Sequence, residues 1–239
     1  MHFAWNEETI AWFKAASIYT GFHRKLADLL RETVSGTELM YDIGCGLGLL
    51  SQELAGEVGR IVGVDMNREA LASLEADAAA RGIGNISTLH GDCYQTEPVC
   101  DVILMSYFGS STLELFLPFC KQLISIVDLD EGSSMGGKGL SGSKRKRQTA
   151  DKLERQLQQA GRHYTLEPVS LEFGQPFVSK PDASRFLQVY YGCTPGETEA
   201  YLAGRLVQAE QAPHAYYLPY TKHMGVFRIE GGAQACMCS

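Results

Sequence analysis

The chain has 239 residues, a formal net charge of −7, 45% hydrophobic residues and 21% charged residues, as in a globular protein of one domain with additions or of two small domains. The acidic balance argues against broad binding to nucleic acid or to anionic membranes. No apolar run approaches the roughly 20 residues that span a bilayer, and the N-terminus lacks a secretory pattern. The seven cysteines are irregularly spaced, which does not indicate a set of disulfides. We therefore expect a cytoplasmic protein with reduced thiols.

The first 130 residues alternate between predicted helices and predicted strands. Two helices are predicted at 6–16 and 19–34, where apolar residues recur at helical spacing. Short apolar runs predict five strands over 38–43, 60–64, 85–89, 101–105 and 123–129. Further helices are expected just after Gly48, from Asn67 through Arg81, and at 111–121. This alternation indicates parallel strands joined by crossovers, with helices on both faces of the sheet.

The rest of the chain is predicted to complete and cover this sheet. A linker rich in Gly, Ser and Lys at 131–147 leads to an amphipathic helix that ends at Gly161. Alternation predicts strands at 165–173 and 223–230, with helices at 181–191 and 195–211 between them. The predicted fold class is a doubly wound, mostly parallel α/β sheet of about seven strands, the last pair antiparallel. We expect an N-terminal helical cap (1–35), a core (36–175 and 221–231), a helical insertion that caps the substrate (176–220) and a tail (232–239).

A glycine-rich turn, YDIGCGLG at 41–48, lies between the first strand and its helix. Glycines let the backbone turn tightly and approach a ligand closely. Asp65 ends the next strand, where a carboxylate can accept hydrogen bonds from both hydroxyls of a ribose. Asp92 ends the third strand, near enough in such a sheet to meet an adenine amino group. These positions predict a ligand that contains a nucleoside.

Two ligands compete for such a loop. A nicotinamide dinucleotide usually requires G-x-G-x-x-G, which seats a pyrophosphate on the following helix. Here the spacing is G-x-G-x-G and Asp42 precedes it, and an acidic residue suits a cation but repels a pyrophosphate. S-adenosylmethionine carries an ammonium and a sulfonium and no phosphate. The spacing therefore favours S-adenosylmethionine as the cofactor.

The segment DIGCGLG, with Asp65 and Asp92 behind it, resembles the class I S-adenosylmethionine-dependent methyltransferases, which have a Rossmann-like fold. The resemblance covers residues 36–130 strongly and the final antiparallel strands more loosely. It implies that the loop cradles the amino acid part of the cofactor, that Asp65 binds the ribose, and that Met66 packs on the adenine, which Asp92 faces. The cofactor-binding residues that it implies are Asp42, Gly44, Cys45, Gly46, Gly48, Asp65, Met66, Asp92, Cys93 and Ser106.

Two segments depart from the family's pattern. The segment at 106–108, which the resemblance places beside the transferred methyl group, lacks the Asn/Asp-Pro-Pro-Tyr run of amino-directed nucleic-acid methyltransferases. The usual Pro-Gly-Gly turn before the fifth strand is replaced by the sequence FCKQ at 119–122. The helices before residue 35 and the insertion at 176–220 carry large aromatic residues and are not basic on balance, which suits an enclosed, partly apolar pocket. The predicted function is therefore methyl transfer to a small-molecule acceptor. A hydroxyl, thiol or ammonium acceptor needs a general base, and the candidates are Tyr107, Tyr19 and His23.

Weaker signals leave two alternative functions open. The basic run at 144–147 is a possible contact for RNA, and a macromolecular acceptor is therefore the first alternative. A non-catalytic module that binds S-adenosylmethionine is the second. Cys236 and Cys238 have no second pair at matching spacing, so we expect no metal site. Aromatic residues gather near the N-terminus and between the last two strands, where they either pack the core or line a substrate pocket.

Overall fold

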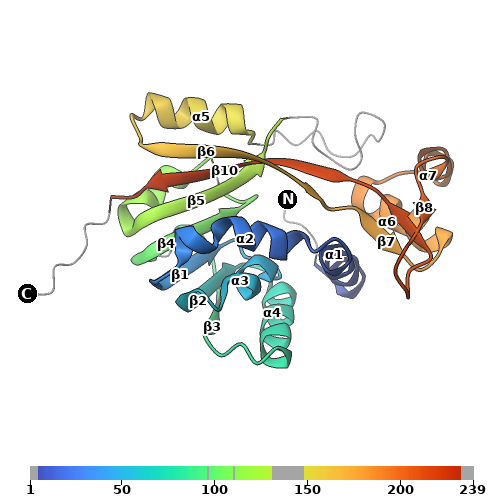
Figure 1. Ribbon diagram of the computed structural model, residues 1–239, viewed down its shortest axis with the longest axis horizontal. Coiled ribbons are helices and arrows are strands. Elements are labelled where there is room, and N and C mark those ends of the chain that lie inside the picture. The colour runs from blue at the N-terminus through green and yellow to red at the C-terminus, as the bar shows by residue number, and fades with distance from the viewer. Residues whose placement is uncertain (1–4, 96, 110, 131–147, 233–239) are drawn as a thin grey trace, which may run out of the picture.

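A computed structural model describes residues 5–95, 97–109, 111–130 and 148–232 of the chain (Figure 1). Its main sheet has seven strands in the order β3-β2-β1-β4-β5-β10-β6. The strands are β1 (Thr37–Ile43), β2 (Val58–Asp65), β3 (Ile86–His90), β4 (Cys100–Ser106), β5 (Cys120–Asp128), β6 (Tyr164–Glu172) and β10 (Thr221–Glu230). The first five are parallel, and β10 runs antiparallel between β5 and β6. The predicted doubly wound, mostly parallel sheet is thereby confirmed.

Helices pack against both faces of this sheet. On one face, α2 (Phe22–Val34) and α3 (Leu49–Leu54) close a core with β1, β4, β5 and β10. Phe22, Leu26 and Leu30 recur every four residues along α2, which places them on one side of the helix, and all three are buried. On the other face, α5 (Ala150–Gln159) and two 3₁₀ turns cover β4, β5 and β10. The fourth helix, α4 (Arg68–Ala80), packs beside β2 and β3.

One predicted helix is replaced by 3₁₀ turns, and another is shorter than expected. Residues 111–121 do not form one helix: they fold into two 3₁₀ turns, Leu113–Leu115 and Leu117–Phe119, and β5 already begins at Cys120. Pro118 occupies the second turn and has no N–H to continue a helical ladder. The helix predicted at 195–211 ends as α7 (Pro195–Leu202), because Gly204 then adopts a left-handed φ of 75°.

The segment between β6 and β10 is not purely helical, which corrects the predicted helical insertion. It contains α6 (Lys180–Tyr191) and α7 together with a small antiparallel sheet in the order β7-β9-β8. The strands of this second sheet are β7 (Gln175–Phe177), β8 (Val207–Gln208) and β9 (Tyr216–Leu218). They are too short to show an alternating apolar pattern that would distinguish them from loops.

The first helix joins this insertion to the core. The helix α1 (Glu7–Thr20) begins at a capping box made by Asn6 and Thr9. The indole Nε1 of Trp12 donates a hydrogen bond of 2.8 Å to Asp182 of α6, and Gln175 donates one of 3.0 Å to the Trp12 carbonyl. In Figure 1, α1 lies between the body of the sheet and the insertion. The N-terminal helix and the insertion therefore pack as one unit.

Candidate functional site

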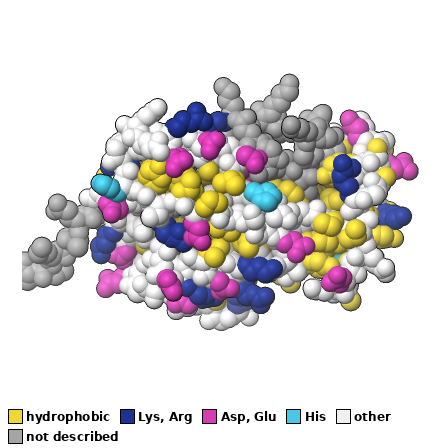
Figure 2. All heavy atoms as spheres, turned by 45° about the horizontal axis from the view of Figure 1, so that its top comes forward, with side chains coloured by type: hydrophobic (Ala, Val, Ile, Leu, Met, Phe, Trp, Pro, Cys, Tyr) yellow, Lys and Arg dark blue, Asp and Glu magenta, His cyan; other side chains and the backbone are white. Residues whose placement is uncertain are grey.

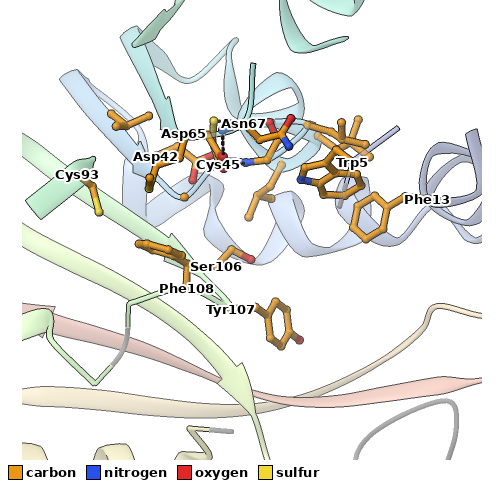
Figure 3. A pocket seen from close by; sticks show the side chains of 18 of the residues that line it. Trp5, Phe13, Asp42, Cys45, Asp65, Asn67, Cys93, Ser106, Tyr107 and Phe108 are labelled. Atoms are coloured by element: carbon orange, nitrogen blue, oxygen red, sulfur yellow. Dashed lines mark hydrogen bonds between the residues drawn. The ribbon is translucent and has the colours of Figure 1, made fainter. Parts of the chain in front are cut away.

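A cavity of about 780 Å³ opens at the edge where the parallel strands end (Figure 3). The loop after β1, the ends of β2, β3 and β4, and residues of α1, α2, α6 and β10 line it. Ligands of open α/β sheets bind at this edge. All ten cofactor-binding residues implied by the family resemblance line this one cavity: Asp42, Gly44, Cys45, Gly46, Gly48, Asp65, Met66, Asp92, Cys93 and Ser106.

The carboxylate of Asp65 holds the glycine loop in place. Its Oδ2 accepts a hydrogen bond of 2.8 Å from the backbone N–H of Gly46, and its Oδ1 accepts one of 2.8 Å from Asn67. The loop turns by means of left-handed φ angles at Gly44, Gly46 and Gly48. Each carboxylate oxygen keeps lone pairs for a further donor. Asp65 can therefore organise the loop and bind a ligand hydroxyl at the same time.

Asp42 is buried at the floor of the cavity. Its Oδ2 accepts a hydrogen bond of 2.7 Å from the hydroxyl of Ser51. Burial raises the pKa of Asp42 to about 7, the Ser51 hydrogen bond opposes this shift, and the nearby charge of Asp65 adds to it. Asp42 thus changes its charge close to neutral pH.

The remaining cofactor candidates lie around the ends of β3 and β4. Met66 is exposed, and Asp92 accepts a hydrogen bond of 3.0 Å from the backbone N–H of Tyr94. Cys93 is buried, and burial raises the pKa of its thiol to about 11, so the thiol is neutral at physiological pH. These side chains form a rim around the space beside the loop.

At the other end the cavity is lined by aromatic rings and one lysine. Tyr107 follows β4 with a φ of 57°, a conformation that non-glycine residues rarely adopt and that is concentrated at functional sites. Its hydroxyl donates to the sulfur of Met224 at 3.5 Å. The Nζ of Lys222 lies 3.5 Å from the centre of the Tyr107 ring. Figure 3 shows Tyr107 across the cavity from Asp65, while Phe108 lies closer to the glycine loop.

His23 is enclosed by aromatic rings at this same end. Phe13, Phe22 and Phe173 each lie within 6 Å of its ring, centre to centre. Its Nδ1 shares a hydrogen bond of 2.7 Å with the Ser17 hydroxyl. Burial, and secondarily the charge of Lys222, lower its pKa to about 3. His23 is therefore a neutral imidazole at physiological pH.

Tyr19, the third catalytic candidate, lies outside the cavity. Its hydroxyl accepts a hydrogen bond of 3.0 Å from the backbone N–H of Glu210. Its ring stacks on Tyr217 at 4.7 Å between centres. These contacts attach α1 to the insertion, so we withdraw Tyr19 as a candidate base.

Sequence reasoning missed several residues of the aromatic end, chiefly Phe13, Phe173 and Lys222. Phe173 follows β6, and Lys222 lies at the start of β10. Because β10 runs antiparallel to β5, its first residues lie at the edge where the parallel strands end. The predicted direction of the last strand was thus a signal that could have placed Lys222 at the site.

The residues at the glycine-loop end fit a cationic, hydroxyl-bearing group better than a phosphate. Asp42, Asp65 and Asp92 line this end. Among the described residues that line the cavity, Lys222 at the aromatic end is the sole Lys or Arg. A pyrophosphate beside three carboxyl groups would lack a cationic partner. These three carboxyl groups therefore suit the ammonium, sulfonium and ribose hydroxyls of S-adenosylmethionine.

Comparison with known proteins supports the family resemblance. Residues 40–118 match the model of a family described as a methyltransferase domain. The chain is 35% identical over 81 residues to a probable cobalt-precorrin-6B C(15)-methyltransferase (decarboxylating) of Methanothermobacter thermautotrophicus, which is 33% of this chain and 41% of that protein. It is 33% identical over 76 residues to zinc finger CCCH domain-containing protein 24 of Arabidopsis thaliana, 32% of this chain and 9% of that protein. The chain thus spans less than half the length of these relatives.

The fold is also shared with solved structures. Magnesium protoporphyrin IX methyltransferase from Synechocystis PCC 6803, solved with bound S-adenosylhomocysteine, aligns with a TM-score of 0.55 at 11% identity. The alignment covers 97% of this chain and 90% of that one. Residues 40–118 are thus similar to a methyltransferase domain, and the chain shares its fold with a solved methyltransferase that binds S-adenosylhomocysteine, in agreement with the resemblance seen in the sequence. S-adenosylmethionine is the cofactor of the class that the sequence resembles.

Some sequence predictions fall on parts of the chain outside the described residues. The basic run at 144–147 and the cysteine pair at 236 and 238 belong to these parts. Within the described ranges, no group of three or more His, Cys, Asp or Glu side chains is placed to hold a metal ion. Nor does any helix in these ranges have the length and apolar character needed to cross a membrane.

Proposed function

We propose that the protein transfers the methyl group of S-adenosylmethionine to a small-molecule acceptor. The observation that carries this proposal is the continuity of the cavity. The same space is lined by the glycine loop, by Asp65, and by Phe13, Phe173 and Tyr190 from the segments that flank the sheet. A partly apolar pocket beside a cofactor loop suits a small acceptor and hinders the entry of a nucleic-acid duplex.

Surface charge agrees with this choice over a macromolecular acceptor. On the face shown in Figure 2, Lys and Arg side chains are interspersed with Asp and Glu and do not gather into one basic patch. Binding to nucleic acid relies on clustered positive charge.

The name of the Methanothermobacter thermautotrophicus relative also describes an enzyme that methylates a precorrin, a small molecule.

The residues that line the cavity indicate which part of the reaction the protein performs and which part the cofactor performs. S-adenosylmethionine supplies a methyl group on a good leaving group, so the protein need only hold the two reactants in line and exclude water. Asp65 and Asp42 hold the cofactor through its ribose and its ammonium. Tyr107 and the surrounding aromatic rings seat the acceptor.

A proton must leave a hydroxyl, thiol or ammonium acceptor. His23 is neutral, since burial holds its pKa at about 3, and only a neutral imidazole can accept a proton. In the tautomer whose Nδ1–H donates to the Ser17 hydroxyl, the Nε2 of His23 carries the lone pair that can accept a proton. His23 is the candidate base for this proton. An imidazole with so low a pKa is a weak base, so it suits an acceptor whose proton is already acidic or whose binding raises the pKa of His23.

The experiment measures S-adenosylhomocysteine formation in the presence of small-molecule, RNA and protein acceptors. Turnover with a small molecule is expected, and His23→Gln should lower kcat while leaving the affinity for S-adenosylmethionine unchanged. Turnover with RNA or protein alone would establish the macromolecular alternative. Cofactor binding with no turnover on any of the three classes would favour a non-catalytic module.

A further inference from the structure

The indole ring of Trp5 lies against the cofactor loop at Gly46. A Cβ at Gly46 would be 3.2 Å from Cζ2 of the indole and 3.6 Å from both Cε2 and Nε1. Trp5 and the glycine loop line the same cavity, and Figure 3 shows the indole on the same side of this cavity as Asn67. The ring therefore borders the part of the cavity that receives the cofactor.

Packing around α1 supports this indole. Trp5 directly precedes Asn6, which caps the start of the helix. The ring of Phe13, from the same helix, meets the indole nearly at a right angle with 5.3 Å between centres. Phe13 in turn contacts Phe173, which follows β6, at 5.4 Å between centres. A ring that is already held in place loses little conformational entropy when a ligand binds beside it.

The neighbours of Gly46 indicate which part of the cofactor would lie beside the indole. The N–H of Gly46 donates 2.8 Å to Asp65, the carboxylate that would hold the ribose. The charge of Asp65 also raises the pKa of Asp42, which would hold the ammonium, so the two carboxyl groups are close to each other. In S-adenosylmethionine the sulfonium sulfur joins the ribose to the amino acid chain. A ring that contacts the loop between these two carboxyl groups thus borders the position of the sulfonium.

We infer that Trp5 stabilises the sulfonium of S-adenosylmethionine by a cation–π interaction and so distinguishes the methyl donor from its demethylated product. Among aromatic side chains, tryptophan attracts a cation most strongly. When the lone pair of the acceptor forms a bond to the methyl carbon, the electrons of the broken carbon–sulfur bond stay on the sulfur, which becomes a neutral thioether. The product then loses its attraction to the indole. This inference rests on the proposed function, whose ribose and ammonium contacts it uses.

The test compares three ligands by calorimetry in the absence of an acceptor. S-adenosylmethionine is a sulfonium, S-adenosylhomocysteine is a neutral thioether, and sinefungin has an amine-bearing carbon in place of the methylated sulfur. All three share the adenine, the ribose and the amino acid, so ratios of their affinities isolate the central charge. Trp5→Leu should weaken the two cationic ligands about three- to thirtyfold more than the thioether. Trp5→Phe keeps an aromatic face and should lose less.

Trp12, the other tryptophan of the chain, provides the control. It does not line the cavity, so Trp12→Phe should affect all three ligands to the same degree. This variant also leaves Trp5 as the single indole without altering it. At saturation, S-adenosylmethionine and sinefungin should therefore change its fluorescence differently from S-adenosylhomocysteine.

Three outcomes would overturn the inference. The first is a ratio of affinities that stays within twofold of the wild-type ratio in Trp5→Leu. The second is a loss confined to S-adenosylmethionine, since this would indicate contact with the methyl group and no role for the charge. The third is the same fluorescence with all three ligands in Trp12→Phe. Failure of the wild type to bind any of the three would instead refute the proposed function, and the inference with it.

Discussion

Gly44 lies against the face of the Phe108 ring, so closely that a Cβ at Gly44 would overlap the ring carbons. The glycine opens the cofactor loop after β1, and the phenylalanine follows β4, the neighbouring strand. Phe108 therefore closes one side of the loop. The sequence suggested that Gly44 is small to admit the cofactor, whereas the structure shows that it is also small to admit a residue of the protein.

This contact predicts the behaviour of Gly44 variants. Gly44→Ala should lose most of its affinity for S-adenosylhomocysteine, because the methyl group displaces Phe108 and the φ of 71° disfavours any residue with a Cβ. Adding Phe108→Ala to Gly44→Ala removes the overlap and leaves only the backbone strain, about 1–2 kcal/mol. The double variant should thus recover part of the affinity, as a double-mutant cycle by calorimetry would measure. Strictly additive losses would contradict the contact.

Asp65 provides a second prediction. Asp65→Asn keeps a side-chain acceptor for the loop but loses the charge and one acceptor oxygen, and it should weaken S-adenosylhomocysteine binding about tenfold or more. An alanine there would also release the N–H groups of Gly46 and Asn67, so the asparagine is the cleaner variant. Asp101, which lies at the start of β4 and away from the cavity, is the control. Its carboxylate also accepts hydrogen bonds from two backbone N–H groups. Asp101→Asn should bind the ligand normally, and equal losses in both variants would refute a ligand role for Asp65.

Asp42 connects cofactor binding and stability to pH. Its pKa rises from 3.8 when unfolded to about 7 when folded, so the folded protein holds a proton that the unfolded chain has released. This group therefore lowers the free energy of unfolding of the ligand-free protein as pH rises from about 4 to about 7, by about 1.4 kcal/mol for each pH unit in that range. The free energy of unfolding of Asp42→Asn should not fall with pH in this way. At pH 8 it should exceed that of the wild type, as denaturant unfolding would measure.

Cofactor binding should respond to pH in the opposite sense. The ionised form of Asp42 attracts an ammonium, so affinity for S-adenosylhomocysteine should increase as pH rises through about 7. Calorimetry across this range should show the increase in the wild type and a weaker, pH-independent affinity in Asp42→Asn. A wild-type affinity that stays constant from pH 6 to pH 8 would rule out a titrating Asp42 in contact with the ligand.

The gathering of the cofactor-binding candidates in one cavity was predictable from sequence because it depends on local patterns. The loop at 44–48, Asp65 and Asp92 each follow a strand that is apolar enough to recognise, and parallel strands bring their ends to one edge. The acceptor half depends on tertiary packing. Phe13 and Lys222 are far apart in sequence, and neither has a local signal that distinguishes a pocket residue from a core or surface residue.

The same contrast between local patterns and tertiary packing explains the errors in the predicted fold. The main strands are apolar or alternating runs, so a mostly parallel sheet of about seven strands was predictable from general rules of α/β topology. The order of the strands was not among the predictions. The short strands β7, β8 and β9 pair only because the insertion folds back on itself, and no periodicity marks them. Tyr19 was a reasonable candidate by type and position, but its place on α1 directs it toward Tyr217.

The last prediction concerns closure of the cavity by α1 and the insertion. The contacts that join the two include the hydrogen bond from Trp12 to Asp182, which is partly buried and accepted by a carboxylate, and an exposed ion pair between Arg185 and Glu8. Segments that close over a ligand gain order when it binds. Hydrogen exchange should therefore slow in 5–30 and 180–220 when S-adenosylhomocysteine is added, and slow further with a bound acceptor.

The two links allow closure to be separated from general stability. Trp12→Phe retains a buried ring but loses the hydrogen bond, so both segments should exchange faster and ligand protection should fall. Arg185→Gln is the control, because an exposed ion pair contributes about 0–1 kcal/mol and its loss should change exchange little. Exchange in β1 and β4 should stay the same in both variants, since these strands form the core. Equal protection in Trp12→Phe and the wild type would mean that the N-terminal helix and the insertion respond to the ligand independently of each other.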